Sequence, residues 1–146
     1  REIKGLGFAV KVDTNGTYPE RLGVLLREGL VDYVAMDVKA PLDDRYRAVV
    51  RRAIDLEPLV RSMTLLRESD VAGEFRTTVH PLLGQADLLD LARQLSPDDV
   101  WFLQAFVPAP EVLPEIRSLP ALSAEDLAGV LPDLREIVSG VRLRAA

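Results

Sequence analysis

The sequence predicts an α/β protein in which helices flank a parallel sheet of about five strands. Segments rich in β-branched and aromatic residues alternate along the chain with segments of helical periodicity. The segment 31–39 is nearly all apolar, as expected of a strand covered on both faces. A chain of 146 residues is also long enough to bury one sizeable core. Strand–helix alternation of this kind is typical of an open doubly wound sheet or of part of a barrel.

Five segments are expected to be strands because they are rich in β-formers and end at turn signals. The first ends at Asn15-Gly16, and the second and third end at Pro41 and Pro81. In chain order the expected strands are 7–14, 31–39, 73–81, 99–108 and 141–145.

Five further segments are expected to be helices because their apolar residues recur at helical spacing. Pro19 and Pro58 suit first turns, and Asp55 and Ser123 are expected N-caps. Pro132 is expected to kink or divide the last helix. In chain order the expected helices are 19–30, 42–53 (short and irregular), 55–70, 84–96 and 123–140, with a proline-rich loop over 107–120 before the last.

Composition excludes several classes of function. A net charge of −5 with dispersed basic residues argues against a nucleic-acid partner. No apolar run approaches the length of a membrane helix, so we expect a cytoplasmic protein with no membrane partner. Residues 1–146 contain no cysteine, which removes thiolate zinc, iron–sulfur and thiol-nucleophile sites from within them. The single histidine, His80, precedes Pro81 and is interpreted as a loop residue rather than a catalyst.

Polar side chains gather where the predicted strands end, and in parallel α/β folds ligands bind at that edge. Asp13 and Thr14 could form only a turn with Asn15-Gly16. Asp37 and Lys39 could form only a salt bridge at the rim. Arg76 needs an anionic partner, which either a protein carboxylate or a ligand could supply.

Taken together, these residues predict a small-molecule site with a cation. Two aspartates on successive strands can converge on one hard cation, with backbone carbonyls and a ligand oxygen completing its shell. A lysine and an arginine beside them suit a carboxylate-bearing ligand. The sequence has no Ser-His-Asp set and no glycine-rich phosphate loop, so hydrolase and kinase functions have no support.

Four motifs in a fixed order resemble the radical S-adenosylmethionine superfamily. They are GFAVKVDTNGTYPE, GLVDYVAMDVKAPL, EFRTTVHPLL and WFLQAF. Within the superfamily they are similar to activating enzymes of glycyl radical enzymes, such as the anaerobic ribonucleoside-triphosphate reductase activating proteins. The resemblance covers the chain from Lys4 to about Val141.

The resemblance implies a partial (β/α) barrel of six strand–helix units. In this family a [4Fe-4S] cluster binds S-adenosylmethionine through its methionine amine and carboxylate. An electron from the cluster cleaves the sulfonium, and the resulting 5′-deoxyadenosyl radical abstracts hydrogen from a glycine of the partner enzyme. The implied partners are thus a glycyl radical enzyme and an electron donor such as flavodoxin or ferredoxin.

The resemblance also implies roles for individual residues. Phe106 stands where pyruvate formate-lyase activating enzymes have a histidine, so no cofactor contact is carried over there. The implied monovalent-cation site comprises Asp13, Thr14, Ala35 (through its carbonyl) and Asp37. The implied cofactor contacts are Lys39 and Arg76.

The chain departs from the family because it has neither the Cys-x3-Cys-x2-Cys loop nor the Gly-Gly-Glu motif. In the family these follow the first and second strands. We therefore expect residues 1–146 to be the C-terminal portion of a radical S-adenosylmethionine core domain, lacking its first two units and inactive alone. The strand 7–14 would then be a sheet edge with unpaired backbone groups. We therefore expect the isolated chain to aggregate or to pair with another chain.

Two other functions stay open at this level. One is a non-catalytic α/β module that binds a nucleotide-like ligand or a protein. The other is a radical S-adenosylmethionine enzyme that acts on a small molecule, because substrate choice in such folds lies in variable loops.

Overall fold

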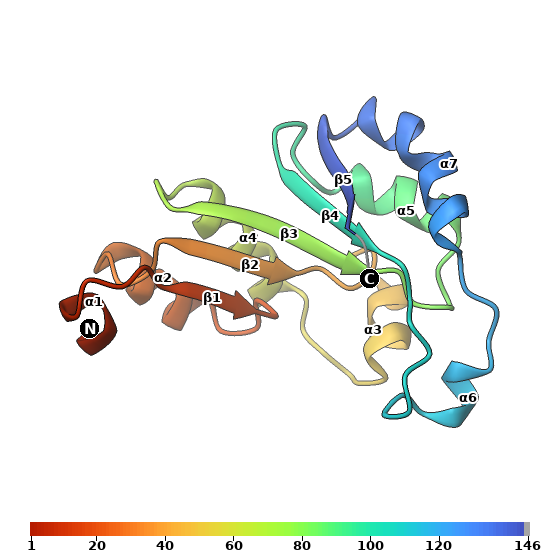
Figure 1. Ribbon diagram of the computed structural model, residues 1–146, viewed down its shortest axis with the longest axis horizontal. Coiled ribbons are helices and arrows are strands. Elements are labelled where there is room, and N and C mark those ends of the chain that lie inside the picture. Colours follow the sequence, from red (N-terminus) through yellow and green to blue (C-terminus); the bar gives the residue numbers. More distant parts are fainter. Residues whose placement is uncertain (145–146) are drawn as a thin grey trace. The chain divides into compact units, whose positions relative to one another are not determined.

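The computed structural model describes residues 1–144 and has the predicted α/β fold (Figure 1). Its five strands form one sheet in the order of the chain, and the outer pairs β1–β2 and β4–β5 are parallel. This sequential order is the one found in (β/α) barrels; a doubly wound sheet reverses its strand order at a switch point. The strands are β1 (Lys11–Thr14), β2 (Tyr33–Asp37), β3 (Ala72–Thr78), β4 (Val100–Gln104) and β5 (Gly140–Arg144).

The described residues also contain the predicted helices, together with two short ones. The helices are α1 (Glu2–Gly5), α2 (Pro19–Arg27), α3 (Asp44–Val50), α4 (Glu57–Arg67), α5 (Gln85–Ala92), α6 (Pro114–Arg117) and α7 (Ala124–Arg135).

Two details of the predicted helices are wrong, and one of the two outcomes predicted at Pro132 is excluded. The segment expected to be irregular is a regular helix, α3, because the Asp43 side chain accepts the Arg45 amide and caps it. The N-cap of α4 is Leu56 rather than Asp55, although Asp55 still accepts the Glu57 amide at 3.1 Å. Helix α7 is not divided at Pro132, because buried side chains before and after the proline anchor both parts; a kink there stays a prediction.

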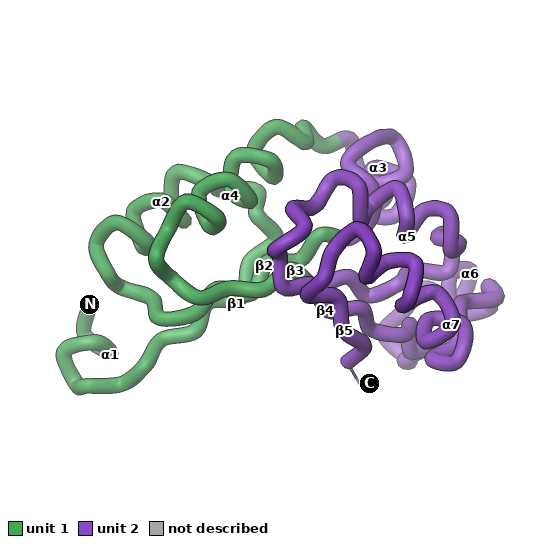
Figure 2. Tube along the Cα trace, turned by 90° about the horizontal axis from the view of Figure 1, so that it is seen from above, with its two compact units in different colours: residues 1–38, 54–75 green, residues 39–53, 76–146 purple. Residues whose placement is uncertain are grey.

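The chain divides into two compact units, which Figure 2 colours separately. Unit 1 comprises residues 1–38 and 54–75. Unit 2 comprises residues 39–53 and the chain from 76 onward. The boundary falls inside β3, between Phe75 and Arg76.

The core of unit 1 forms where α2 and α4, which pack against each other, cover one face of the strands. Helix α4 lies on the face that carries Gly73, because a Cβ on that glycine would meet Leu66 at 2.9 Å. The Arg67 guanidinium lies 5.3 Å from the Phe75 ring centre on the same side. Because strand side chains alternate, Glu74 must lie on the opposite face.

The core of unit 2 forms between its strands and helices α5 and α7. Trp101 is fully buried, and its indole Nε1 donates to the Thr77 hydroxyl at 3.0 Å. A capping box starts α7: the Ser123 hydroxyl accepts the Asp126 amide, and the Asp126 carboxylate accepts the Ser123 amide.

One arginine joins α3 to α5 within unit 2. The Arg45 guanidinium contacts Asp43, Asp87 and Asp90 at 2.6–2.8 Å. Its hydrogen bonds to Asp43 and Asp90 hold the pKa of each carboxyl below the ordinary value of 3.8.

We expect this cluster to make folding stability fall with acid below pH 3.8. A carboxyl whose pKa is lower in the folded than in the unfolded state contributes its whole stabilisation of the folded protein at pH values above its unfolded pKa. This contribution is lost as the pH falls through the folded pKa. Arg45→Ala should flatten this part of the pH profile, measured by urea unfolding between pH 2 and 6. Arg93→Ala removes an exposed contact to Asp90 alone and is the control. Equal slopes for Arg45→Ala and the wild type would contradict the prediction.

Candidate functional site

The residues of the predicted cation site lie together at the carboxyl ends of β1 and β2, all within unit 1. Asp13 is the direct cross-strand partner of Ala35, and Thr14 is the partner of Met36. Partners in a parallel pair share a face, and Asp37 follows Ala35 by two residues. Asp13, Ala35 and Asp37 therefore share one face of the sheet, whereas the Thr14 side chain lies with Met36 on the face toward α4.

The loop after β1 is also the turn that the sequence allows. The Thr14 hydroxyl accepts the Gly16 amide at 3.1 Å, and the Asn15 side chain accepts both the amide and the hydroxyl of Thr17. The Asp13 side chain is about half exposed, with its Oδ1 atom 3.6 Å from the Lys11 ammonium. The turn and an accessible carboxylate thus coexist.

A buried acidic group that the sequence analysis did not single out lies on the same face of unit 1. Glu74 is only 3% exposed, and its carboxylate accepts the Tyr33 hydroxyl at 2.7 Å. The Lys11 ammonium lies 5.6 Å from the Tyr33 ring centre. The alternation of Glu74 with apolar Phe75 was the signal that could have placed it opposite the helices.

The two predicted cofactor contacts, Lys39 and Arg76, belong to unit 2. Lys39 follows β2, and Arg76 is half-buried in β3. Because the Thr77 hydroxyl contacts Trp101 in the core, the adjacent Arg76 lies on the other face of the strand.

That face of unit 2 carries further arginines that the sequence analysis missed. Arg142 and Arg144 are the cross-strand partners of Phe102 and Gln104. The Arg144 guanidinium stacks 4.0 Å from the Phe102 ring centre. Arg76, Arg142 and Arg144 therefore lie on this face of unit 2.

His80 lies in the loop after β3, as interpreted from the sequence. Its Nδ1 atom accepts the Leu82 amide at 3.1 Å, and its ring meets Phe106 edge to face at 6.3 Å. Partial burial lowers the pKa of the imidazole, so the neutral form is favoured. These contacts fit a structural role for the ring.

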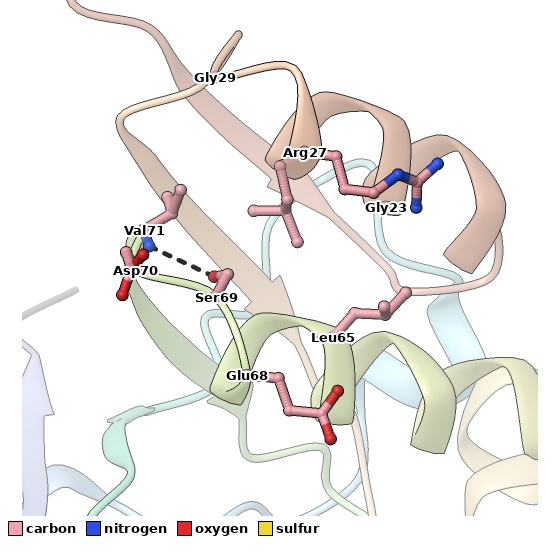
Figure 3. Close-up of a pocket in the computed structure, with 9 residues that line it drawn as sticks. Gly23, Arg27, Gly29, Leu65, Glu68, Ser69, Asp70 and Val71 are labelled. Atoms are coloured by element: carbon pink, nitrogen blue, oxygen red, sulfur yellow. Dashed lines mark hydrogen bonds between the residues drawn. The ribbon is translucent and has the colours of Figure 1, made fainter.

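A separate cavity of about 560 Å³ lies in unit 1 between the C-terminal ends of α2 and α4 (Figure 3). The Ser69 hydroxyl accepts the Val71 amide at its rim. Because Gly29 and Val71 precede β2 and β3, this cavity lies at the amino edge of the strands, away from Asp13 and Asp37. The residues lining it are Gly23, Leu26, Arg27, Gly29, Leu65, Glu68, Ser69, Asp70 and Val71.

The donor set at the strand ends consists of oxygen atoms. Within residues 1–144, no three histidine, aspartate or glutamate side chains gather to hold a metal ion. Two carboxylates, a hydroxyl and a backbone carbonyl fit a weakly held hard cation. They do not fit an iron–sulfur cluster, for which the chain offers no thiolate. None of the helices in the described chain is long and apolar enough to cross a membrane.

Comparison with known proteins finds one similar to the whole of this chain. No family model matches the sequence. The chain is 32% identical to a protein of Methanocaldococcus jannaschii named "putative glycyl-radical enzyme activating enzyme". The alignment covers 99% of this chain but only 62% of that relative. This similarity supports the resemblance to the radical S-adenosylmethionine activating enzymes that the motifs indicate.

Proposed function

We propose that this chain is the C-terminal part of a radical S-adenosylmethionine enzyme that activates a glycyl radical enzyme, such as an anaerobic ribonucleotide reductase. The enzyme generates the glycyl radical on its partner by reductive cleavage of S-adenosylmethionine. The observation that carries the proposal is the pairing of Asp13 with Ala35, with Asp37 on the same face at the same strand ends. The Methanocaldococcus relative, through its name, supports the same class.

The residues of unit 1 would hold a monovalent cation. Asp13 and Asp37 supply negative charge, while Thr14 and the Ala35 carbonyl supply neutral oxygens. A cation held there leaves part of its coordination shell open, which a cofactor carboxylate can enter. The role of this chain is then to orient the methionine end of S-adenosylmethionine.

In unit 2, Lys39 and Arg76 are the residues that would bind an anionic group of the cofactor. Arginine suits this role because its planar guanidinium can donate two parallel hydrogen bonds to one carboxylate. The half-buried position of Arg76 lowers the competition from water.

The [4Fe-4S] cluster would supply the electron for the cleavage and would itself receive one from a donor such as flavodoxin or ferredoxin. Residues 1–146 contain no cysteine, so its thiolate ligands would come from residues outside them. The coding sequence upstream of Arg1 is the simplest check. Cys-x3-Cys-x2-Cys followed by Gly-Gly-Glu supports the proposal, and a start codon close to Arg1 favours the non-catalytic module instead.

We expect Asp37→Asn to weaken S-adenosylmethionine binding at least tenfold in a form of the protein that carries the cluster ligands. Loss of one carboxylate weakens the cation that holds the cofactor carboxylate. The measurement is isothermal titration with S-adenosylmethionine in potassium buffer, alongside release of 5′-deoxyadenosine under reducing conditions.

Asp70→Asn is the matched control because Asp70 lines the cavity at the opposite edge of the same unit. It should bind S-adenosylmethionine like the wild type. Unchanged affinity in Asp37→Asn, or a wild type that neither binds nor cleaves S-adenosylmethionine, would contradict the proposed function.

A further inference from the structure

A buried serine on α4 contacts the turn that follows the candidate cation site. Ser62 has no exposed surface, and its hydroxyl donates to the Gly16 carbonyl at 2.7 Å. The two residues are 46 positions apart in the sequence, and both belong to unit 1. The contact therefore connects the loop after β1 to α4.

The turn packs against its surroundings through backbone atoms. Gly16 has a φ of +75°, a conformation that favours glycine. A Cβ at this position would lie 2.1 Å from the Met36 Cε atom and 3.5 Å from the Ser62 Cβ atom. Met36 is in turn the cross-strand partner of Thr14. The turn thus lies directly against the strand and the helix, with no side chain of its own between them.

Both polar groups of the Gly16 backbone are hydrogen-bonded by side chains. The Thr14 hydroxyl accepts its amide, and the Ser62 hydroxyl donates to its carbonyl. A buried carbonyl that loses its donor is costly, so removing the Ser62 hydroxyl favours a rearranged turn. Because Thr14 is itself bonded to Gly16, such a rearrangement would move the Thr14 oxygen.

We propose that Ser62 is a positioning residue for the cation site, acting through Gly16 on Thr14 and Asp13. The inference rests on the proposed function, since it assigns Ser62 to the site formed by those residues with Ala35 and Asp37. Ser62 touches no ligand itself. Its hydroxyl holds the Gly16 carbonyl, and the Gly16 amide in turn donates to the Thr14 hydroxyl, so loss of the Ser62 hydroxyl would displace one of the proposed cation ligands.

The test compares Ser62→Ala with Ser69→Ala in the 146-residue chain. Ser69 also donates from its hydroxyl to a backbone carbonyl, that of Leu66, but just beyond the C-terminal end of α4. Potassium chloride is titrated against choline chloride at constant ionic strength, and the amide resonances of Thr14 and Asn15 report binding. Amide hydrogen exchange over residues 14–17 is measured on the same samples, after circular dichroism establishes that each is folded.

We expect Ser62→Ala to weaken potassium binding about tenfold and to speed exchange of the 14–17 amides by a similar factor. Ser69→Ala should match the wild type in both measurements. Ser62→Cys keeps a weak hydrogen-bond donor, so its potassium affinity and amide exchange should lie between those of Ser62→Ala and the wild type. It replaces Ser62→Ala in the test if that variant does not fold.

The outcomes separate the two hypotheses. A wild type that shows no saturable response to potassium overturns the cation site, and the inference with it. A wild type that binds potassium, with Ser62→Ala binding it equally well, overturns the inference alone. Faster exchange with unchanged potassium affinity also overturns it, because Ser62 would then stabilise the turn without serving the site.

Discussion

Alanine in place of Gly140 is expected to lower the free energy of unfolding by about 3 kcal/mol. A Cβ on Gly140 would lie 2.4 Å from the Asp99 carbonyl oxygen and 3.3 Å from the Val100 Cα atom. Both are backbone atoms, so no side-chain rotation can relieve the overlap. Gly140 and Val100 are also cross-strand partners, so the two strands β4 and β5 would have to separate. The measurement is urea unfolding at neutral pH.

The neighbourhood of Gly140 offers little room for adjustment. The Ser139 amide donates to the Pro97 carbonyl at 3.0 Å, and the Asp99 carboxylate accepts the Ser96 amide at 2.8 Å. Gly129→Ala is the matched control, because Gly129 lies in α7 with no atom within 4 Å of an added Cβ. It should raise stability by about 0.7 kcal/mol, since alanine favours a helix over glycine. Equal stability of the two variants would refute the argument from close backbone approach.

Anaerobic reconstitution of residues 1–146 with iron and sulfide is expected to give no cluster absorbance. A cluster of this kind needs thiolate ligands, and the chain has no cysteine. The visible absorbance should therefore stay at the level of the reagents after desalting, and reductive cleavage of S-adenosylmethionine should be absent.

The protein extended upstream, if it carries the three-cysteine loop, is the positive control for the same reconstitution. It should hold iron and sulfide in stoichiometric amounts. A stoichiometric cluster in residues 1–146 would contradict the prediction and would require ligands other than cysteine.

The fold followed from the sequence wherever local and tertiary preferences agree. The apolar run that became β2 is buried at Val34, Ala35 and Met36, as its composition requires. At Pro132 local chemistry favours a kink or a break, and the break is absent because buried neighbours hold the helix together. Prediction failed in α3, where the Asp43 cap outweighs a weak apolar pattern.

The candidate site was predictable only in part. Asp13 and Asp37 stand out because they are polar residues at the ends of apolar strands. Ser62 does not stand out, because a serine within an amphipathic helix carries no sign of a partner 46 residues away. In the sequence Glu74 looks like any other charged residue, and only its position in β3 shows that it is buried.

Because Trp101 is buried in unit 2, its fluorescence reports on the folding of that unit. It is the single tryptophan, it lies wholly within unit 2, and its indole is hydrogen-bonded to Thr77. Its emission should therefore shift to longer wavelength when that unit opens to water, and not in response to changes confined to unit 1. Tyr18 and Tyr33 belong to unit 1. The third tyrosine, Tyr46, is buried in unit 2, so the tyrosine signal reports on unit 1 alone only in a Tyr46→Phe variant. In that variant, comparing tryptophan emission with near-ultraviolet tyrosine signals would reveal whether the two units unfold together or one after the other.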